Sequence, residues 1–463
     1  MLLTQLPRAV AGSSRAVWAT RAVPRMTTPV FRAQAVPLAR RFQSTKPEVT
    51  ILGKTYPRDE WSNTPAAIQE KLGRNLHLTQ GHPLSTLREI IEGHFAGYTA
   101  VRPDSPVVTV HQNFDELGFP PDHPGRSKTD TYYVNGTHML RTHTSAHEVE
   151  AYKTGADAFL IAADVYRRDE IDSSHYPVFH QMEGMRHWTQ DQLPGLIEEN
   201  KRLEKELSQI PIVIEDTSTI GPENPLQDCH DPVIATEMAK NLKHSLNGMI
   251  FKLFGDAAAR SGEPLKVRWI DAYFPWTTPS FEVEVWYNGE WLEILGCGVV
   301  IQKTLERGGV GHKSGWAFGL GLERIAMVLF GIPDIRLFWS TDPRFLDQFA
   351  TGDITTFKPY SRYPPCYKDM SFWLPDSVKQ ASAAEILPWH ENDYCEIVRD
   401  VAGDLVENVS LIDDFTHPKS GRRSLCYRLN YRSMDRNLTN EEVNVLQDQV
   451  QKRVIQDMGI EMR

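Results

Sequence analysis

Two short stretches decide the fold of the central part of this chain, DVYRRD at residues 164–169 and GLGLER at residues 319–324. The first reads as the end of a strand that carries an aromatic side chain, arginines and an acid. The run HYPVFHQME at residues 175–183 reads as a second strand after a loop. The second stretch is a glycine turn that opens a helix, with Arg324 in its first turn. A fixed guanidinium is well suited to phosphate oxygens, so both stretches predict a site for an anionic ligand.

The segments around these stretches predict a mixed antiparallel sheet flanked by helices. Strands are expected at 160–167, 267–273, 281–287 and 291–302, and the last three alternate apolar and polar residues. Helical patterns occur at 83–95, 151–159, 196–210 and 322–329. We therefore expect an α+β fold with an antiparallel central sheet.

The last hundred residues predict a second domain of ferredoxin-like βαββαβ order. Its strands are expected at 368–374, 404–412 and 423–432 with a very short one near 459, and its helices at 391–402 and 440–457. Thr439, with Glu442 three residues later, predicts a capping box at the start of the last helix.

The charge of the chain is unevenly distributed. The first 47 residues hold eight basic and no acidic side chains, and the rest holds 42 basic against 60 acidic ones. A basic leader of this kind is typical of a mitochondrial transit peptide, and RRF at residues 40–42 resembles its processing site. The alternative is a basic arm that binds RNA. The acidic remainder has no overall basic field, so any nucleic acid must bind a local patch.

Length, hydropathy and cysteine usage exclude several classes of protein. A chain of 463 residues exceeds one ordinary core, so two or three domains are expected. No run approaches the ~18 consecutive apolar residues of a membrane-spanning helix, so we expect no membrane partner. The five cysteines form no CxxC pair and no His/Cys cluster, which predicts reduced thiols and no zinc site.

DVYRRD and GLGLER lie some 150 residues apart, and together they resemble motifs 2 and 3 of the class II aminoacyl-tRNA synthetases. Alone, each has an ordinary explanation, a salt-bridged strand end or a tight turn. GHPL at residues 81–84 resembles motif 1 but is less specific. The resemblance implies that ATP activates an amino acid as an adenylate, with Arg167 and Arg324 as catalytic arginines and adenine stacked on Phe179. It implies the ATP-binding set Arg167, Asp169, Ser174, His175, Tyr176, Phe179, Glu293 and Arg324.

Three further groups of residues resemble the phenylalanine-tRNA ligase family in its single-chain organellar form, from about residue 75 to the C-terminus. They are RTHTSAH at 141–147, HYPVFHQME at 175–183, and GCG at 296–298 with WAF at 316–318. The resemblance implies that Ser145, Gln181 and Glu183 hold the amino group and carboxylate of phenylalanine. A carboxylate and neutral acceptors suit an ammonium group. The full set that it implies for phenylalanine is Ser145, Ala146, His147, Gln181, Met182, Glu183, Phe274, Trp276, Ala317 and Phe318.

The pocket for the substrate ring requires aromatic edges and a small residue. Phe274 and Ala317 match the family, whereas Trp276 stands where a second phenylalanine is usual, which puts the outer wall of the pocket in doubt. Both aromatic residues could instead be core residues between strands. Glu293 is expected to contact ATP directly or through Mg²⁺. Glu284 is equally well explained as a solvated strand residue.

A basic cluster in the C-terminal domain predicts the tRNA contact. Lys419 and five arginines fall within 18 residues that contain one acid, Asp435. Nearby aromatic residues Tyr427, Tyr431, Phe372 and Trp373 suit stacked, unpaired anticodon bases. The alternative is an ordinary solvated basic strand. The resemblance implies binding of tRNA(Phe) by this domain, and the expected contacts are Arg422, Arg423, Arg428 and Arg432.

These inferences give a complete expected organisation. The expected segments are a transit peptide at 1–42, an N-terminal extension at 43–80, a class II catalytic domain at 81–342, a linker at 343–358 and the ferredoxin-like domain at 359–463. The expected protein is a monomer of the mitochondrial matrix that uses phenylalanine, tRNA(Phe) and ATP with Mg²⁺. Two rival functions are an inactive synthetase paralogue that binds RNA and a class II ligase that activates another carboxylate, as biotin-type ligases do.

Overall fold

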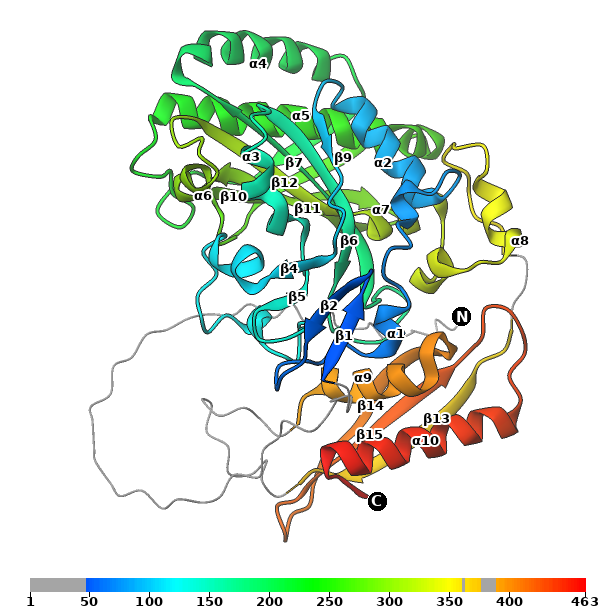
Figure 1. Cartoon of the computed structure of the whole chain (residues 1–463). Helices are drawn as coiled ribbons and strands as arrows, with labels where there is room; N and C mark the ends of the chain where they lie inside the picture. Colours follow the sequence, from blue (N-terminus) through cyan, green and yellow to red (C-terminus); the bar gives the residue numbers. More distant parts are fainter. Residues whose placement is uncertain (1–46, 360–362, 376–388) are drawn as a thin grey trace, which may run out of the picture. The chain divides into compact units, whose positions relative to one another are not determined.

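The computed structural model describes residues 47–359, 363–375 and 389–463 (Figure 1). The transit peptide expected at residues 1–42 lies outside the described residues. Within the described ranges, no helix combines the length and the apolar character that crossing a membrane requires.

The central element is an eight-stranded sheet with the strand order β3-β6-β7-β12-β11-β10-β9-β8. Its strands are β3 Thr99–Val101, β6 Ala158–Tyr166, β7 Val178–Trp188, β8 Ile212–Asp216, β9 Leu265–Asp271, β10 Thr277–Tyr287, β11 Glu290–Val300 and β12 Ser314–Gly321. The strands from β6 to β9 pair antiparallel, as expected. The two edge pairs, β3 with β6 and β8 with β9, are parallel.

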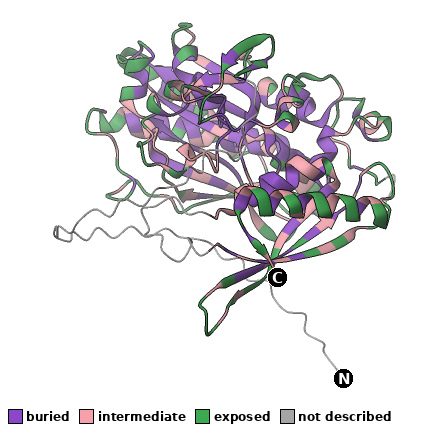
Figure 2. Cartoon of the chain, turned by 60° about the horizontal axis from the view of Figure 1, so that its bottom comes forward, coloured by how far each residue is buried: buried purple, intermediate pink, exposed green. Residues whose placement is uncertain are grey.

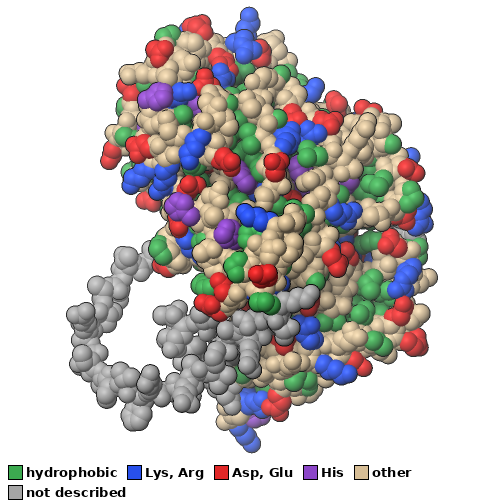
Figure 3. Space-filling view, in the orientation of Figure 1, with side chains coloured by type: hydrophobic (Ala, Val, Ile, Leu, Met, Phe, Trp, Pro, Cys, Tyr) green, Lys and Arg blue, Asp and Glu red, His purple; other side chains and the backbone are tan. Residues whose placement is uncertain are grey.

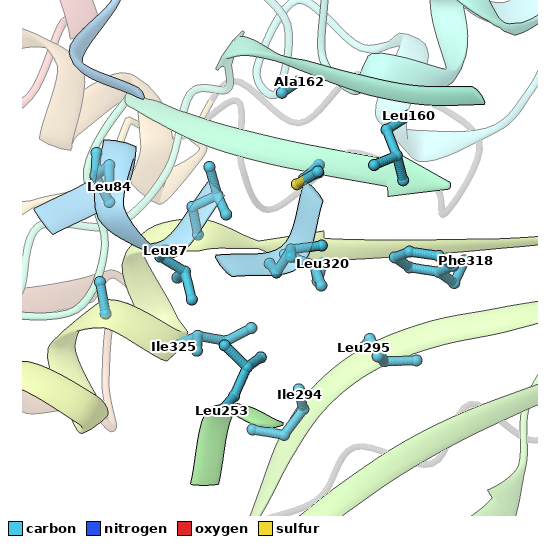
Figure 4. Close-up of a cluster of buried hydrophobic side chains, with 14 of the residues drawn as sticks. Leu84, Leu87, Leu160, Ala162, Leu253, Ile294, Leu295, Phe318, Leu320 and Ile325 are labelled. Carbon is cyan, nitrogen blue, oxygen red and sulfur yellow. The ribbon is translucent and has the colours of Figure 1, made fainter. Parts of the chain in front are cut away.

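One face of this sheet packs against helices and forms the main core. The helices are α2 Pro83–His94, α4 Leu193–Leu207, α5 Pro232–Ser261 and α7 Leu322–Phe330. In Figure 4, side chains of α2, α5 and α7 lie beside Ile294 and Leu320 from the sheet. Buried residues accordingly concentrate in the sheet and the helices that cover it (Figure 2).

Two helical segments differ from the sequence-based expectation. The 30-residue helix α5 was not expected, because it lies between α4 and the sheet and carries apolar residues around most of its circumference. The helix expected at 151–159 is instead the short α3, Glu148–Tyr152, followed by a turn. Gly155 has a φ of +81° there, which ends the helical path before β6 begins.

The segments at the two ends of the catalytic body are packed against it. The N-terminal hairpin of β1 Glu48–Ile51 and β2 Lys54–Pro57 places Val49, Ile51 and Tyr56 in the main core. The segment expected to be a linker contains α8 Pro343–Leu346 and buries three phenylalanines. Phe345, Phe349 and Phe357 all belong to the main core. The catalytic body therefore continues to about residue 357, because these rings need its apolar surface.

Shorter elements surround the sheet. They are α1 Ala66–Gln69, β4 Val107–Thr109, β5 His138–Leu140 and α6 Gln302–Arg307. The strands β4 and β5 form a small antiparallel sheet of their own.

The C-terminal residues form the expected βαββαβ domain. Its elements are β13 Cys366–Trp373, α9 Glu391–Ala402, β14 Val406–Thr416, β15 Arg423–Tyr431, α10 Asn440–Met458 and β16 Glu461–Met462. The four strands are antiparallel in the order β14-β15-β13-β16. Thr439 and Glu442 make the expected capping box at the start of α10.

A buried ion pair fixes the end of β6 next to the chain that precedes α3. The guanidinium of Arg141 pairs with the carboxylate of Asp164, and their side chains are 2% and 4% exposed. Arg141 also donates to the carbonyl of Asp164 at 2.6 Å and to that of Ser105 at 2.8 Å. The hydroxyl of Tyr166 donates to the other oxygen of Asp164 at 2.5 Å. The network holds RTHTSAH against the strand that leads to Arg167.

Arg141→Ala should lower the free energy of unfolding by about 3–5 kcal/mol, because it leaves a buried carboxylate without its partner. Denaturant unfolding followed by tryptophan fluorescence measures this change. Arg423→Ala is the matched control, since it breaks a half-exposed pair with Asp414 and should cost less than about 1 kcal/mol. Equal losses of unfolding free energy for the two variants would contradict the stabilising role of the buried pair of Arg141 and Asp164.

Candidate active site

A cavity of about 580 Å³ opens on the face of the central sheet that the main helices do not cover. The residues that line it include Phe119, His143, Ser145, Glu148, Arg167, Gln181, Glu183, Phe274, Trp276, Glu293 and Ala317. They come from five strands or strand ends and from the loops before α3, so the cavity unites segments far apart in the sequence.

The register of three strands makes the floor of the cavity. Gln181, Glu183 and Met185 of β7 lie opposite Gly321, Gly319 and Ala317 of β12. On the next strand, Gly319 and Ala317 lie opposite Gly296 and Gly298 of β11. Side chains alternate between the two faces of a strand, so these residues share one face. The centre of that face has only glycine and alanine side chains, which leaves it hollow.

Aromatic rings wall this hollow. A Cβ at Gly296 would lie 2.5 Å from the ring of Phe274, so the ring occupies the space that a side chain would take. The ring of Phe274 stacks with that of Trp276 at 5.9 Å between centroids. Trp276 in turn contacts Phe119 at 5.2 Å and His143 at 5.9 Å. Trp276 therefore belongs to the wall of the cavity and is not simply a core residue between strands.

A carboxylate and its hydrogen-bond partners form the acidic end of the cavity. The hydroxyl of Ser145 donates to Oε1 of Glu183 at 2.6 Å, and the backbone N–H of Thr144 donates to Oε1 of Gln181 at 3.3 Å. Burial raises the pKa of Glu183 to about 7, although the hydrogen bond from Ser145 and the charge of Arg167 act in the opposite direction. This group can bind an ammonium ion.

Arg167 supplies the fixed cation. Its Nε donates to the carbonyl of Thr142 at 2.8 Å, and its guanidinium lies 5.2 Å from the centroid of the Phe179 ring. Burial lowers the pKa of Arg167, which nevertheless remains charged. Asp169, two residues later, also lines the cavity. The end of β6 thus presents one oriented guanidinium beside an aromatic face.

Arg324, at the start of α7, lies outside the cavity lining, yet its guanidinium is 3.8 Å from the carboxylate of Glu293, which lines it. Glu282 lies in the same region, and its pKa is raised by burial and by the charges of Glu293 and Glu284. Glu284 itself pairs with Arg268, so it is a salt-bridged strand residue. The two carboxyl groups of Glu282 and Glu293 offer oxygen ligands of the kind that a hard divalent cation prefers.

Several expected site residues lie outside the cavity lining. They are Ala146, His147, Ser174, His175, Tyr176, Phe179 and Met182. Met182 points into the main core because it alternates with Gln181 and Glu183. The hydroxyl of Tyr176 donates to Asp404 at 2.6 Å, and His175 bonds to Asp172 at 2.7 Å. Phe318 borders the cavity, but its ring stacks on Phe95 at 5.3 Å on the helix-covered face of the sheet.

The lining residues that sequence reasoning missed include Phe119, Glu148, Met185 and Glu282. Alternation along β7 from Gln181 and Glu183 could have found Met185, and alternation along β10 could have found Glu282. Glu148 directly follows RTHTSAH, which is a weaker signal. Nothing in the sequence connects the loop of Phe119 with this face.

The C-terminal sheet has a covered face and an outer face. Phe372, Tyr427 and Tyr431 are at most 2% exposed and belong to the core under the helices, so the expectation that their rings stack on bases was wrong. The reason is alternation, which turns them to the face opposite Arg428. On the outer side, the guanidinium groups of Arg422 and Arg463 lie 5.0 Å and 5.5 Å from the centroid of the Trp373 ring.

Each of the four arginines expected to contact RNA has an acidic partner. Arg422 pairs with Glu461, Arg423 with Asp414, Arg428 with Asp369 and Arg432 with Glu407, all at 2.5–2.8 Å. Acidic and basic side chains are likewise interspersed over the face shown in Figure 3. The arginines are accessible, but their field is partly neutralised.

Two family models match this architecture. The model described as the class II core domain of tRNA synthetases (F) matches residues 68–202 and 235–349. The ferredoxin-fold anticodon-binding domain matches residues 361–463. The antiparallel sheet, the arginine at the end of β6 and the helix opened by GLGLER therefore define a class II aminoacyl-tRNA synthetase core, joined to an anticodon-binding domain.

Curated relatives narrow the class further. The mitochondrial phenylalanine–tRNA ligase of Saccharomyces cerevisiae is 46% identical over 452 residues, covering 90% of this chain and 95% of that protein. The mitochondrial phenylalanine–tRNA ligase of Mus musculus is 45% identical, and the match covers 89% of this chain and 88% of that protein. A probable mitochondrial phenylalanine–tRNA ligase of Drosophila melanogaster is 42% identical, with coverages of 91% and 93%. The chain belongs to the phenylalanine–tRNA ligase family, in its mitochondrial branch.

Proposed function

We propose that this chain attaches phenylalanine to tRNA(Phe) in the mitochondrial matrix, through a phenylalanyl-adenylate. The observation that carries the proposal is the cavity itself. It unites an ammonium-binding carboxylate, a hollow floor with aromatic walls, and a fixed guanidinium. The two rival functions lack support, because an inactive paralogue needs no such constellation and a ligase for another carboxylate needs no aromatic hollow.

Phenylalanine binds at the acidic end of the cavity. The ammonium group lies at Glu183, with Ser145 and Gln181 as its neutral hydrogen-bond partners. The ring enters the hollow over Ala317, between Phe274 and Trp276, where apolar burial and aromatic edges favour it. Four other expected residues support this site without contacting the substrate. They are Ala146, His147, Met182 and Phe318.

ATP binds next to the amino acid. Arg167 contacts the α-phosphate, and Asp169 lies beside it in the lining. Adenine stacks on Phe179, which shares the sheet face of Gln181, and Arg324 covers the other side of the base near Glu293. Ser174, His175 and Tyr176 form the loop that precedes β7 and shape the entrance for ATP.

The first step forms the adenylate. An oxygen of the phenylalanine carboxylate attacks the α-phosphorus of ATP, the bond to the β-phosphate oxygen breaks, and pyrophosphate leaves. Negative charge grows on the α-phosphate in the transition state, and the guanidinium of Arg167 is already oriented to stabilise it. A ribose hydroxyl at the end of the tRNA then attacks the carbonyl carbon, and AMP leaves.

Glu282 and Glu293 fit a divalent cation, since both carboxyl groups line the ATP end of the cavity and their mutual repulsion calls for a counter-charge. Bound Mg²⁺ would neutralise charge on the ATP phosphates and on the departing pyrophosphate. Arg324 offers a second positive charge to the same region through its contact with Glu293.

The outer face of the C-terminal sheet binds the anticodon region of the tRNA. Trp373, with Arg422 and Arg463 against its ring, offers a stacking surface next to positive charge. Arg423, Arg428 and Arg432 contact phosphates by exchanging their acidic partners for the RNA backbone.

Each domain has a separate role in this reaction. Residues 1–42 serve as the transit peptide, and the 43–80 segment buttresses the catalytic domain. That domain starts at 81 and extends through the segment 343–358, and residues 359–463 bind the tRNA. The protein acts as a monomer, because one chain carries both the cavity and the anticodon-binding domain.

Amino-acid-dependent ATP–pyrophosphate exchange tests the activation step. The chain lacking residues 1–42 should exchange with phenylalanine far more than with tyrosine or with no amino acid. Arg167→Ala should reduce the exchange about 100-fold or more, since it removes the charge that meets the α-phosphate. Arg202→Ala is the matched control, because Arg202 forms an exposed pair with Glu206 on α4. A folded chain that exchanges with no amino acid would favour the inactive RNA-binding paralogue.

Binding of tRNA tests the outer face of the C-terminal sheet. Arg422→Ala should weaken tRNA binding about tenfold at low salt and reduce the dependence of log affinity on log salt by about 1. Exchange without tRNA should not change. Arg453→Ala on α10 is the control, since it pairs with Asp400 and Asp457 away from that face. Equal effects of both variants would contradict this assignment.

A further inference from the structure

The acidic end of the cavity contains two buried carboxyl groups. Glu148 on α3 is 1% exposed, Glu183 on β7 is 6% exposed, and both line the cavity. Oε1 of Glu148 accepts from the hydroxyl of Tyr152 at 2.8 Å, and Oε1 of Glu183 accepts from Ser145 at 2.6 Å. Oε2 of each has no hydrogen-bond partner among the described residues. These two groups are called the carboxyl pair below.

The surroundings of the carboxyl pair provide little positive charge. Tyr152 on α3 donates to Glu148, and its ring lies 5.5 Å from that of His187 on β7. Burial lowers the pKa of His187 to about 4, and burial with the charge of Arg167 lowers that of His143 to about 3, so both imidazoles are neutral. The parts of β11 and β12 that face the pair are uncharged. Arg167, beside Glu183, is the one cation that acts on the pair among the described residues.

Two like charges cannot both be stable in such surroundings. Burial raises the pKa of Glu148 to about 8, the charge of Glu183 adds to the shift, and the hydrogen bond from Tyr152 opposes it. The pKa of Glu183 is raised to about 7. The pair therefore holds protons at neutral pH, and it titrates as a coupled unit. An ammonium group placed beside it favours the ionised forms, and a proton must then leave to solvent.

We propose that Glu148 is a positioning residue for the amino-acid substrate, and that binding of the substrate ammonium group drives release of a proton from the pair of Glu148 and Glu183. The inference rests on the proposed function, since it requires an amino acid in this cavity. The neutral acid form of Glu148 leaves Glu183 as the anion that meets the ammonium group. As pH rises, Glu148 contributes a second negative charge that only the bound substrate compensates.

Isothermal titration of phenylalanine into the full chain, in two buffers with different ionisation enthalpies, counts the released protons. At pH 8 the wild-type protein should release more protons per phenylalanine than Glu148→Gln, because burial and the charge of Glu183 raise the pKa of Glu148 and keep part of it protonated when the cavity is empty. Glu148→Gln keeps the acceptor for Tyr152 but cannot ionise, so most of this release should be lost. At pH 7 both proteins should release protons from Glu183. Proton exchange by free phenylalanine is common to both and cancels.

Two further variants keep the test informative. Glu150→Gln removes a carboxylate from the same helix whose side chain is 73% exposed, and it should leave proton release unchanged. Tyr152→Phe removes the donor that stabilises ionised Glu148, so the release should shift to higher pH. This shift is expected even if Glu148→Gln does not fold.

The outcomes separate the inference from the proposed function. Phenylalanine binding with equal proton release at pH 8 in wild type and Glu148→Gln would overturn the role of Glu148 and leave the proposed function intact. Absence of any binding heat from folded protein would overturn both. The inference requires two results. Glu148→Gln, but not Glu150→Gln, should lose proton release at pH 8, and proton release by Tyr152→Phe should shift to higher pH.

Discussion

The register that sets β7 against β12 and β12 against β11 is the constraint on which the functional part of this molecule depends. It brings Gly296, Ala317 and Gly319 to one face of the sheet, where they line the floor of the cavity. A shift of β7 by one residue would turn its polar side chains, Gln181 and Glu183, into the core. The apolar face under α2, α5 and α7 prevents that shift, so the same packing that stabilises the fold also positions the site.

Everything else at the site is arranged around that floor. The buried pair of Arg141 and Asp164 holds RTHTSAH against β6, which brings Ser145 to Glu183 and Arg167 to the edge of the cavity. The rings of Phe274 and Trp276 occupy the space that the glycines leave. The result is a cavity that combines an anion for an ammonium group with a guanidinium for a phosphate, which is the charge pattern that joining an amino acid to ATP requires.

Sequence reasoning found what depends on local pattern. Alternation gave β9 to β11, and the capping box at Thr439 gave the start of α10. The motif residues Arg167, Gln181 and Glu183 all reached the cavity. Sequence reasoning failed where contacts between distant segments determine the structure. Helix α5 has no single apolar stripe because it is covered on two sides. Phe345 is buried against the catalytic core, and nothing in its own segment of sequence predicts that contact. The orientation of Tyr427 and the proximity of Glu148 to Glu183 depend on register and on loop closure, which no single segment of sequence specifies.

The most direct test of the account is the affinity of phenylalanine for Gly296→Ala compared with Gly321→Ala. The atoms nearest to a methyl group at Gly296 belong to the far end of the Phe274 ring, so this change moves the wall of the hollow, whereas a methyl group at Gly321 meets no atom within 4 Å. We expect Gly296→Ala to weaken phenylalanine binding at least about tenfold, corresponding to about 1.4 kcal/mol, with little change for Gly321→Ala. Unchanged affinity in a folded Gly296→Ala protein would show that phenylalanine does not bind over this floor.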